Sequence, residues 1–311
     1  MVTRMETGTH HFPDSSDSGG VNEGSDGPDG PGDCDTDPVV NWGTALRHTR
    51  FGPFEMVGTT GSTNDDLVAR AAGPADDGLV LTTDHQTAGR GRLDRRWDAP
   101  QGTNLTFSTL LRPGWLADPG GGPDRRGLVT SALAVSVVDV LMAMGLDASV
   151  KWPNDVLLAG PQAGKVAGIL AELVTGERPA IVVGLGLNVG WPPPESVISD
   201  EPVPPGATSL ARAGIRVDRW WLMVDVLVAF DRQLAALEST DGPERLRADH
   251  LAASATVGSR VRVERPGGDL VGDAVDLTVD GALVVEPDSG DGEPCGPVVV
   301  NVGDVTHLRA L

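Results

Sequence analysis

Apolar segments of two lengths alternate along residues 39–255, and this alternation constrains the fold more than any other feature. Residues 128–144 and 219–239 are long enough for helices. In the first, large apolar residues recur every three or four positions, as expected for a helix that buries one face. This apolar stripe consists of Leu133, Val137, Val140, Leu141 and Met144. We therefore expect a core that two long helices cover.

Shorter apolar segments, of strand length, lie around these helices. The expected strands are residues 78–86, 104–111, 148–152, 165–174 and 180–190. Another helix is expected to start after Ser62, because serine suits an N-cap and Asp65 falls in the first turn. Strands and helices of these lengths indicate an α+β domain over residues 39–255.

The pattern changes after Thr256. Short strand-like runs follow, separated by turn residues: 259–265, 269–278, 281–287 and 296–303. Runs of this length, spaced about ten residues apart, predict a small β-barrel or sandwich. We assign residues 256–311 to this second domain.

Residues 1–38 are rich in Gly, Asp, Ser and Pro and hold few large apolar side chains. Such a segment cannot bury enough apolar surface to offset the entropy lost on ordering. We therefore expect a disordered acidic tail, with order beginning near Val39. A functional interaction arm is the alternative interpretation of the tail.

The charge of the chain limits its partners. The formal net charge is −20, and residues 1–38 hold nine acidic residues against the single base Arg4. The remaining 273 residues hold 35 acidic and 23 basic residues. An acidic body repels a phosphate backbone, so we expect no nucleic-acid partner, although a local cluster of arginines can still bind a small anion.

The distribution of apolar residues and cysteines predicts a cytoplasmic protein. No segment reaches eighteen consecutive apolar residues and the N-terminus has no apolar signal, so neither membrane insertion nor secretion is expected. Cys34 and Cys295 are the only cysteines, and they lie far apart. We therefore expect no disulfide framework and no zinc site, as suits a reducing compartment.

The segment HQTAGRGRLDRRW, residues 85–97, concentrates positive charge in this acidic chain. Asp94 occupies the third glycine position of a dinucleotide fingerprint and no helix pattern follows, which excludes that motif. As an RNA-binding segment it is too short. The remaining interpretation is a loop whose guanidinium groups close over a carboxylate or phosphate, with Gly89 and Gly91 providing backbone freedom. A solvated basic loop is the alternative.

The segment KWPNDVLL, residues 151–158, ends one strand and begins the next. It places a lysine, the flat indole of Trp152, an amide and the carboxylate of Asp155 together at a strand end. Such a group could stack on a base, bind its polar edge and hold Mg²⁺. An ordinary Asn-Asp turn explains the same residues and stays open as an alternative.

Two glycine-containing strands complete the set of motifs. In GPQAGKVAGIL, Val166 stands where a phosphate loop needs Ser or Thr, so Lys165 would bind an anion only through its side chain. A merely solvated lysine is the alternative. In VVGLGLNV, Gly184 and Gly186 allow a ligand or another backbone to approach closely, and Asn188 adds an amide. A β-bulge without a ligand is equally compatible with these glycines.

Taken in order, STND, HQTAGRGR, KWPND, GKVAGIL and GLGLNV resemble the motifs of biotin protein ligases over roughly residues 57–311. The resemblance implies a mixed β-sheet with packed helices, similar to that of class II aminoacyl-tRNA synthetases, followed by an SH3-like barrel. It implies that biotin attacks the α-phosphate of ATP, releasing pyrophosphate and forming biotinyl-5′-AMP. The biotinyl group then passes to a lysine. ATP and biotin are thus the implied substrates, with Mg²⁺ assisting.

The resemblance also assigns roles to residues. Lys165 and Arg92 would be catalytic, holding the biotin carboxylate and the α-phosphate, and Asp155 would bind Mg²⁺. The residues matched to biotin binding are Ser62, Thr63, Asn64, Gln86, Gly89, Arg90, Gly91, Arg92, Lys165 and Gly168. Those matched to ATP and the adenylate are Arg92, Trp97, Lys151, Asn154, Asp155 and Asn188. Whether Arg95 and Arg96 contact a ligand stays open.

The implied acceptor is the biotin carboxyl carrier domain of acetyl-CoA carboxylase or a related acyl-CoA carboxylase. We expect a monomer or weak homodimer. Family members that also repress transcription carry an N-terminal winged helix-turn-helix, whereas an acidic tail stands there in this chain, so DNA binding is not expected. A lipoate or octanoyl ligase and a biotin-sensing repressor are the alternative functions.

Overall fold

The computed structural model describes residues 38–93, 95–117, 124–195, 197, 202–265, 268–288, 296–301 and 303–308. All of them fall in one unit, Asp37–Leu311. The predicted disordered tail lies outside the described residues except for Pro38, which begins helix α1 (Pro38–Ala45), one residue before the predicted onset of order. Cys34, Asp94 and Cys295 also lie outside the described residues.

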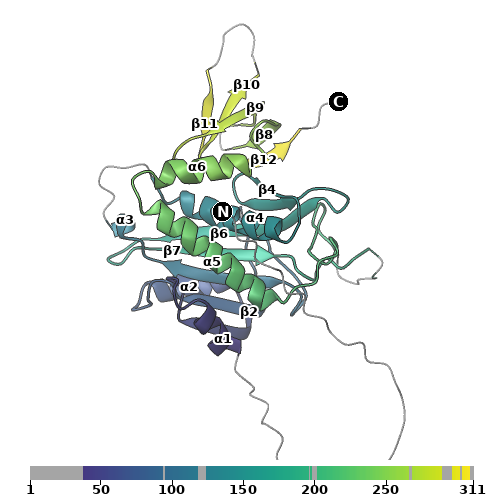
Figure 1. The fold of residues 1–311 in the computed structure, drawn as a ribbon. Helices are drawn as coiled ribbons and strands as arrows, with labels where there is room; N and C mark the ends of the chain where they lie inside the picture. Colours follow the sequence, from purple (N-terminus) through teal and green to yellow (C-terminus); the bar gives the residue numbers. More distant parts are fainter. Residues whose placement is uncertain are drawn as a thin grey trace, which may run out of the picture. The chain divides into compact units, whose positions relative to one another are not determined.

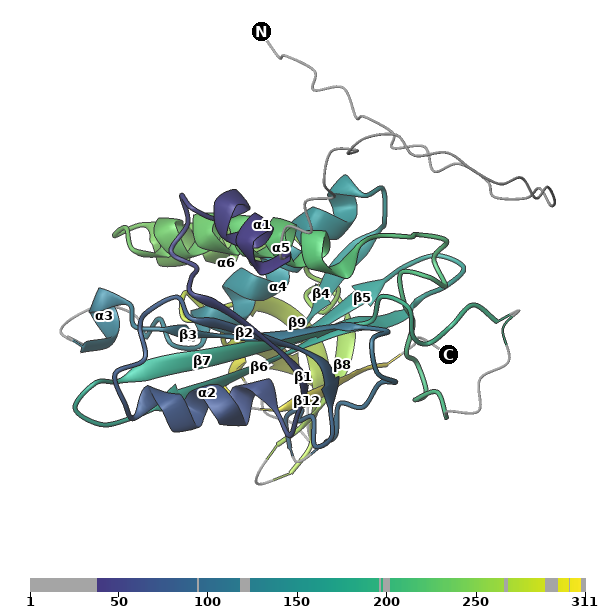
Figure 2. The ribbon, with the colours of Figure 1, turned by 90° about the horizontal axis from the view of Figure 1, so that it is seen from below.

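A seven-stranded mixed sheet with strand order β1-β2-β3-β7-β6-β5-β4 forms the centre of the larger domain (Figure 2). Only β1 and β2 pair in parallel, and the other neighbours pair antiparallel. The strands are β1 (Phe54–Thr60), β2 (Val80–Gln86), β3 (Leu105–Leu111), β4 (Ala148–Lys151), β5 (Asp155–Leu158), β6 (Gly164–Val174) and β7 (Ala180–Leu187). The mixed sheet predicted from the family resemblance is therefore confirmed.

The predicted strands are confirmed, but the sequence missed β1. Every side chain of β1 is at least partly exposed, because the strand lies at the edge of the sheet and pairs only with β2. The alternation of buried and exposed residues that marks a strand is therefore weak there. The turn at residues 152–154 is followed by β5, as predicted.

Helices cover both faces of the sheet (Figure 2). Helix α2 (Thr63–Ala71) packs alone on one face, where Leu67 joins a small core with Leu81 and Leu110. The opposite face carries the larger core under α1, α4 and α5. The remaining helices are α3 (Gly114–Ala117), α4 (Leu128–Ala143), α5 (Arg219–Leu237) and α6 (Gly242–Ala252).

Helix α4 is buried more completely than its sequence predicted. The predicted single apolar stripe is wrong for the first eleven residues, of which only Thr130 is not fully buried. The sheet contacts one side of α4, while α5 and α6 cover others. Conversely, Val140 and Met144, which belong to the predicted stripe, are only partly buried because they lie near the end of the helix.

The C-terminal residues form an antiparallel sheet of order β11-β10-β9-β8-β12, which confirms the predicted small β-rich unit (Figure 1). Its strands are β8 (Arg260–Glu264), β9 (Leu270–Leu277), β10 (Leu283–Pro287), β11 (Val298–Val300) and β12 (Asp304–His307). Alternating residues of these strands form a core that includes Val261, Val263 and Leu283. Strand β12, at the sheet edge, lies beyond the last predicted run, residues 296–303, and was missed.

Trp152 corrects one expectation. The predicted stacking of its indole on a base is wrong, because Trp152 is only 3% exposed and belongs to the core of the C-terminal sheet. Its Nε1 donates to the carbonyl of Gly281 at 3.0 Å, and its backbone amide donates to the Thr256 hydroxyl at 3.0 Å. Trp152 therefore fastens the C-terminal sheet to the turn that precedes β5.

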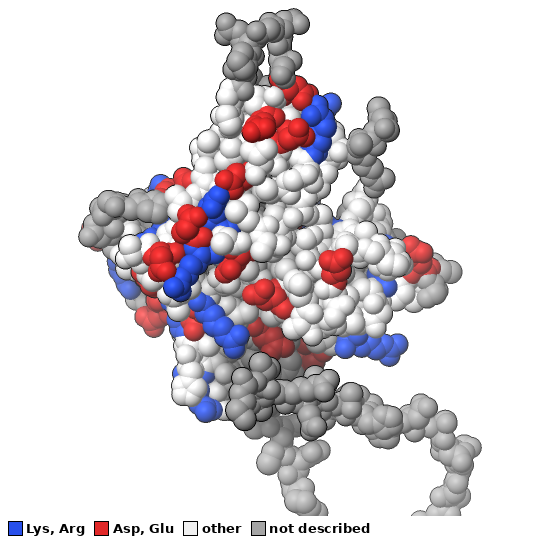
Figure 3. Space-filling model, turned by 45° about the horizontal axis from the view of Figure 1, so that its top comes forward, with Lys and Arg blue, Asp and Glu red and all other residues white. Residues whose placement is uncertain are grey.

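Charged side chains of both signs lie next to one another on the face drawn in Figure 3. Among the ion pairs of the described residues, Arg247 pairs with Asp276 at 2.6 Å, and Arg260 pairs with Asp288 at 2.5 Å. Among the described residues, no helix combines the length and the apolar character needed to cross a membrane.

Candidate functional site

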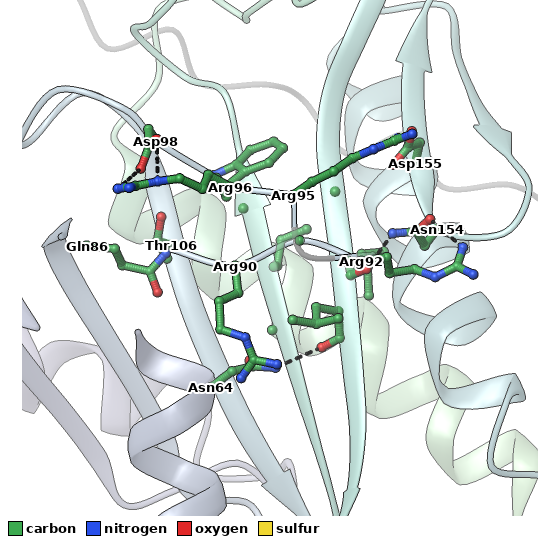
Figure 4. Close-up of a pocket in the computed structure, with 18 of the residues that line it drawn as sticks. Asn64, Gln86, Arg90, Arg92, Arg95, Arg96, Asp98, Thr106, Asn154 and Asp155 are labelled. Atoms are coloured by element: carbon green, nitrogen blue, oxygen red, sulfur yellow. Dashed lines mark hydrogen bonds and ion pairs between the residues drawn. The ribbon is translucent and has the colours of Figure 1, made fainter. Parts of the chain in front are cut away.

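A cavity of about 200 Å³ lies over the face of the sheet that α2 covers (Figure 4). The start of α2, the arginine-rich loop of residues 89–96, and strands β3, β6 and β7 contribute to its lining. The predicted site residues that line it are Ser62, Thr63, Asn64, Gln86, Arg90, Gly91, Arg92, Trp97, Asn154, Asp155, Lys165, Gly168 and Asn188. Gly89 and Lys151 do not line it.

A buried polar network occupies one end of the cavity, where α2 begins. Ser62 caps the helix with extended backbone angles, and its hydroxyl accepts from the amide of Asp65. Gln86 Oε1 accepts from the backbone amide of Thr63 at 2.9 Å, which ties the cap to the end of β2. The Thr63 hydroxyl lies 2.7 Å from that of Ser108 on β3. The helix N-terminus and two strands therefore hold this end rigidly.

Asn64 connects the network to strand β6. Its Oδ1 accepts from the Ser108 hydroxyl at 2.6 Å, and its Nδ2 donates to Glu172 Oε2 at 2.9 Å. Glu172 also pairs with Arg90 at 2.9 Å, and Arg90 pairs with Asp65 as well. The hydrogen bond that Arg90 donates to Asp65, together with the charges of both carboxylates, raises the pKa of Arg90. Arg90 thus lies among carboxylates already, with its charge compensated.

Ser108 and Glu172 were missed in the sequence. Ser108 is completely buried in β3, a strand that also holds two threonines, and Glu172 lies in β6 like an ordinary solvent-facing residue. Neither residue has a local signal, because their function comes from neighbours far away in the chain. Only the pairing of β3, β7 and β6 brings them to the start of α2.

The arginine-rich loop forms a narrow turn across the cavity. The amide of Trp97 donates to the carbonyl of Gly89 at 2.9 Å, and that of Gly91 donates to Arg95 at 2.7 Å. A Cβ atom on Gly89 would lie 2.1 Å from the Trp97 carbonyl oxygen, so close packing requires this glycine. The left-handed conformation in the loop is adopted by Leu93, with φ of 54°. Neither loop glycine adopts it.

Arg92 extends from this loop to the turn before β5. Its guanidinium donates to Asn154 Oδ1 at 3.3 Å and to the carbonyl of Gly303 at 3.3 Å. Burial lowers the pKa of Arg92, and the nearby carboxylates of Asp304 and Asp155 partly oppose this effect. Arg92 therefore carries its charge in a partly desolvated position, and its hydrogen-bond acceptors among the described residues are neutral.

The two arginines left open by the sequence have different partners. Arg95 pairs with Asp304, at the start of β12, and both line the cavity. Arg96 pairs with Asp98 at 3.1 Å, and both residues also line the cavity, although both side chains are more than half exposed. The structure thus connects Arg95 to the C-terminal sheet and leaves Arg96 at the surface.

Lys165 stands at the start of β6, as predicted, and points into the cavity. Its Nζ lies 2.6 Å from Asp155 Oδ1 and 5.4 Å from the centre of the Trp97 ring. Its backbone is held on both sides, since its amide donates to Gly206 at 2.7 Å and its carbonyl accepts from Thr208 at 3.0 Å. Lys165 is therefore fixed in the site and is not merely a solvated surface lysine.

Glycines form the floor of the cavity beneath Trp97. A Cβ on Gly186 would lie 2.3 Å from the indole, and one on Gly168 would lie 3.1 Å from it. At Gly184 a Cβ would lie 2.2 Å from Asn64 Oδ1. Strand β7 pairs without a register shift with both β3 and β6, so the β-bulge that was left open is excluded. The glycines are needed because side chains pack directly on the sheet.

Two predicted nucleotide-binding residues differ from expectation. Asn188 lines the cavity but is only 4% exposed, and its Nδ2 donates to the Thr208 carbonyl at 2.9 Å. Its Oδ1 accepts from the side-chain amide of Asn104 at 3.0 Å. The Asn188 side chain is therefore bonded to protein groups at both its oxygen and its nitrogen. Lys151 lies outside the cavity and near His307. Burial, together with the charge of Lys151, lowers the pKa of the His307 imidazole.

The cavity therefore offers different chemistry at its two ends. Hydroxyl and amide groups near Thr63 and Asn64 suit a neutral polar group, whereas Lys165 and Arg92 at the other end suit an anion. Asp155 is the predicted metal ligand in the lining. Among the residues described by the structure, no group of three or more His, Cys, Asp or Glu side chains could hold a metal ion.

Two family models match the chain. The model described as "Biotin/lipoate A/B protein ligase family" matches residues 60–188, which include the polar network, the arginine-rich loop and Lys165. The model described as "Biotin protein ligase C terminal domain" matches residues 256–308, which form the C-terminal sheet. Both ends of the cavity and the sheet that contributes Asp304 therefore fall within matched regions.

Curated relatives match most of the chain. It is 40% identical over 286 residues to biotin--[acetyl-CoA-carboxylase] ligase of Mycobacterium tuberculosis, covering 88% of this chain and 94% of the relative. It is 32% identical to the protein of the same name from Paracoccus denitrificans, covering 76% and 95% respectively. Biotin protein ligase from Aquifex aeolicus, solved with biotin and ATP, shares the fold with a TM-score of 0.63. That likeness covers 84% of this chain and all of the other, at 24% identity. With this coverage and identity to curated relatives, the chain belongs to the biotin protein ligase family.

Proposed function

We propose that this protein is an ATP-dependent ligase that activates biotin as biotinyl-5′-AMP and transfers it to a lysine of a biotin carboxyl carrier domain. The observation that carries the proposal is the single cavity in which Lys165 and Arg92 face a buried network of neutral polar groups. The names of the relatives from M. tuberculosis and P. denitrificans support acetyl-CoA carboxylase as the source of the acceptor.

Biotin has the two kinds of polar group that this cavity separates. Its ureido ring is neutral and both donates and accepts hydrogen bonds, which suits the groups near Thr63, Asn64 and Gln86. Its carboxylate is an anion and suits the cations at the other end. The bicyclic ring and its chain would then lie between these two ends, beside the Trp97 indole that packs on the glycines of β6 and β7.

In the first step, a carboxylate oxygen of biotin bonds to the α-phosphorus of ATP, and the bond to the bridging oxygen of pyrophosphate breaks. Both reactants are anions, so the step requires cations where negative charge accumulates. Lys165 and Arg92 are placed for this role. In the structure Lys165 pairs with Asp155, which compensates its charge until an anion enters.

In the second step, the neutral ε-amine of the acceptor lysine attacks the acyl carbon of the mixed anhydride. An amide forms, AMP leaves with the electron pair of the broken carbon–oxygen bond, and the amine loses a proton. The mixed anhydride also reacts with water, so exclusion of water protects it. The arginine-rich loop, which crosses the cavity from Gly89 to Arg96, would provide this cover.

Trp97 is proposed to contact the nucleotide. Its indole already lines the cavity beside Lys165, and its Nε1 is buried without a hydrogen-bond partner among the described residues. A flat aromatic ring at this place suits an adenine base. Asn154, which contacts Arg92, lies on the side from which the phosphates would be held.

Magnesium fits the site only as an ion that enters with ATP. Asp155 provides one carboxylate in the lining, and Mg²⁺ is usually bound by one or two carboxylates plus substrate phosphates. When bound, the ion would offset charge on the phosphates. Asp155 would then exchange its contact with Lys165 for a contact with the metal, which leaves Lys165 available to the anion.

The biotin and lipoate alternatives can be separated by experiment. The family model over residues 60–188 covers both kinds of ligase, whereas the one over residues 256–308 is described for biotin protein ligases alone. The purified protein is incubated with ATP, Mg²⁺, a carrier domain and either labelled biotin or labelled lipoate. We expect ATP-dependent transfer of biotin to the carrier lysine. Transfer of lipoate alone would contradict the proposal.

The remaining parts of the proposal concern assembly and location. We propose a monomer or weak homodimer that acts in the cytoplasm and binds neither DNA nor membranes. Sedimentation at increasing protein concentration, with and without biotin and ATP, tests the assembly state. Binding of an operator-like duplex at physiological salt would favour the biotin-sensing repressor instead.

A further inference from the structure

Two residues of the arginine-rich loop contact two consecutive residues of the C-terminal unit, Gly303 and Asp304. Arg92 donates to the carbonyl of Gly303 at 3.3 Å, and Arg95 pairs with the carboxylate of Asp304. Asp304 begins β12, and its side chain is 26% exposed. Through these contacts a domain more than two hundred residues away in sequence contributes to the catalytic cavity.

The charged side chains around Arg92 form ion pairs that leave Arg92 itself out. Asp304 and Asp155 are both close enough to Arg92 to raise its pKa against the effect of burial. Each of these carboxylates nevertheless has another cation as its partner, Arg95 for Asp304 and Lys165 for Asp155. The guanidinium of Arg92 is left with neutral acceptors, the Asn154 amide and the Gly303 carbonyl.

We propose that Arg95 and Asp304 form a latch that positions the arginine-rich loop and keeps the charge of Arg92 available for the adenylate phosphate. Arg95 does so by neutralising the carboxylate that would otherwise pair with Arg92. Both are positioning residues that act through Arg92. This inference rests on the proposed function and extends it to the C-terminal sheet, with a role for Arg95.

The latch predicts an unusual order among variants. In Arg95→Ala the carboxylate of Asp304 is released and competes with the phosphate for Arg92. Because an ion pair between side chains this exposed is weak, its competition with ATP should raise the KM for ATP by about fivefold. In Arg95→Ala/Asp304→Asn the competing charge is gone, so the KM should return to within about twofold of the Asp304→Asn value. The double variant should therefore outperform the single variant Arg95→Ala.

Pyrophosphate release at saturating biotin and varied ATP measures this order, with kcat and KM determined separately. Recovery of the KM in the double variant supports the latch. If Arg95 instead contacts the phosphate directly, the double variant stays as impaired as Arg95→Ala, which would overturn the proposal. If the wild-type protein releases no pyrophosphate at all, the proposed function itself fails.

A second measurement tests the latch without any catalytic activity. Trypsin cleaves after arginine, and the loop offers several arginines once it moves away from the sheet. In the ligand-free full chain, Asp304→Asn should raise the rate of cleavage within residues 90–96 about threefold, in line with the loss of one exposed ion pair. Cleavage products are identified by mass.

Asp288→Asn is the matched control for this measurement. It makes the same change at a carboxylate of the C-terminal sheet, and it also removes an exposed pair with an arginine, Arg260. Asp288 does not line the cavity, so loop cleavage should match the wild-type rate. Equal cleavage rates for Asp304→Asn and the wild type would refute the latch. Faster cleavage in both variants would also refute it, because it would indicate general loosening of the sheet.

Discussion

The two ends of the cavity are built in different ways. The polar network at the start of α2 is buried, and Ser62, Thr63 and Asn64 are each at most 4% exposed. Its hydrogen bonds join one helix N-terminus and three strands. The arginine-rich loop is held by its own backbone hydrogen bonds, by the Arg92 contacts and by ion pairs of the exposed side chains of Arg95 and Arg96. The preformed polar network can therefore recognise a neutral polar group of a ligand. The loop, which lies nearer the surface, can rearrange around an anion.

Lys165 lies on strand β6 of the rigid sheet, yet it stands at the end of the cavity that is proposed to bind an anion. Replacing it with Ala should lower the rate of pyrophosphate release by about a hundredfold to a thousandfold, because a placed charged donor is lost. Lys151→Ala is the control, since Lys151 lies outside the cavity and should leave the rate within about threefold of wild type. An equal loss in both variants would restore the sequence-based role of Lys151.

Arg92 tests the arginine-rich loop. Arg92→Gly removes charged hydrogen bonds to the phosphate, so the adenylate should dissociate about ten to a hundred times faster. Free biotinyl-AMP and nonspecific labelling of lysines should rise accordingly. Retention of the adenylate is followed by rapid filtration after single-turnover formation. An unchanged retention time would contradict the role of the loop as a cover.

Gly186 tests the rigidity of the floor. In Gly186→Ala the new methyl group would overlap the Trp97 ring, and overpacking of this kind typically costs about 1–3 kcal/mol of folding free energy. The KM for ATP should rise as the indole is displaced. Gly58→Ala is the control, because a Cβ there meets no atom within 4 Å. Unfolding in urea, followed by tryptophan fluorescence, measures the change in stability, and pyrophosphate release at varied ATP measures the KM. Equal behaviour of the two variants would show that the floor adapts.

Arg96 should give the smallest effect. Its pair with Asp98 is exposed on both sides, and such pairs contribute little free energy. In Arg96→Ala, the kcat and the KM for ATP should change by less than about twofold. A change as large as that in Arg92→Gly would mean that Arg96 binds the ligand once the loop closes, and the division of the loop would have to be revised.

Local patterns were sufficient for most of the fold. The capping serine before α2 and the apolar periods of α4 and α5 led to the correct elements, since these signals depend on neighbours a few residues away. Strand β1 was missed because an exposed edge strand has little alternation. The burial of α4 on several sides was missed because it depends on α5 and α6, which follow much later in the chain.

The site was predictable as a set of residues more than as a set of contacts. Nearly all residues that the motif resemblance selected line the cavity, with Gly89 and Lys151 as the exceptions, but many other residues of the lining were not selected. No motif contained Ser108, Glu172 or Asp304. Their neighbours in sequence are ordinary strand residues, and no short-range signal distinguishes them.

The amino-acid sequence by itself determined which chemical groups this protein carries and on which elements they lie. The glycines of β6 and β7, the arginines of the loop and Lys165 are all readable from short stretches of chain. Only the tertiary structure decided how their charges are paired. Lys165 pairs with Asp155, Arg90 with Glu172, and Arg95 with Asp304. Ion pairing depends on distances of a few ångströms, which the pairing of β5 with β6 sets for Lys165 and Asp155. The other two pairs join segments 82 and 209 residues apart in sequence.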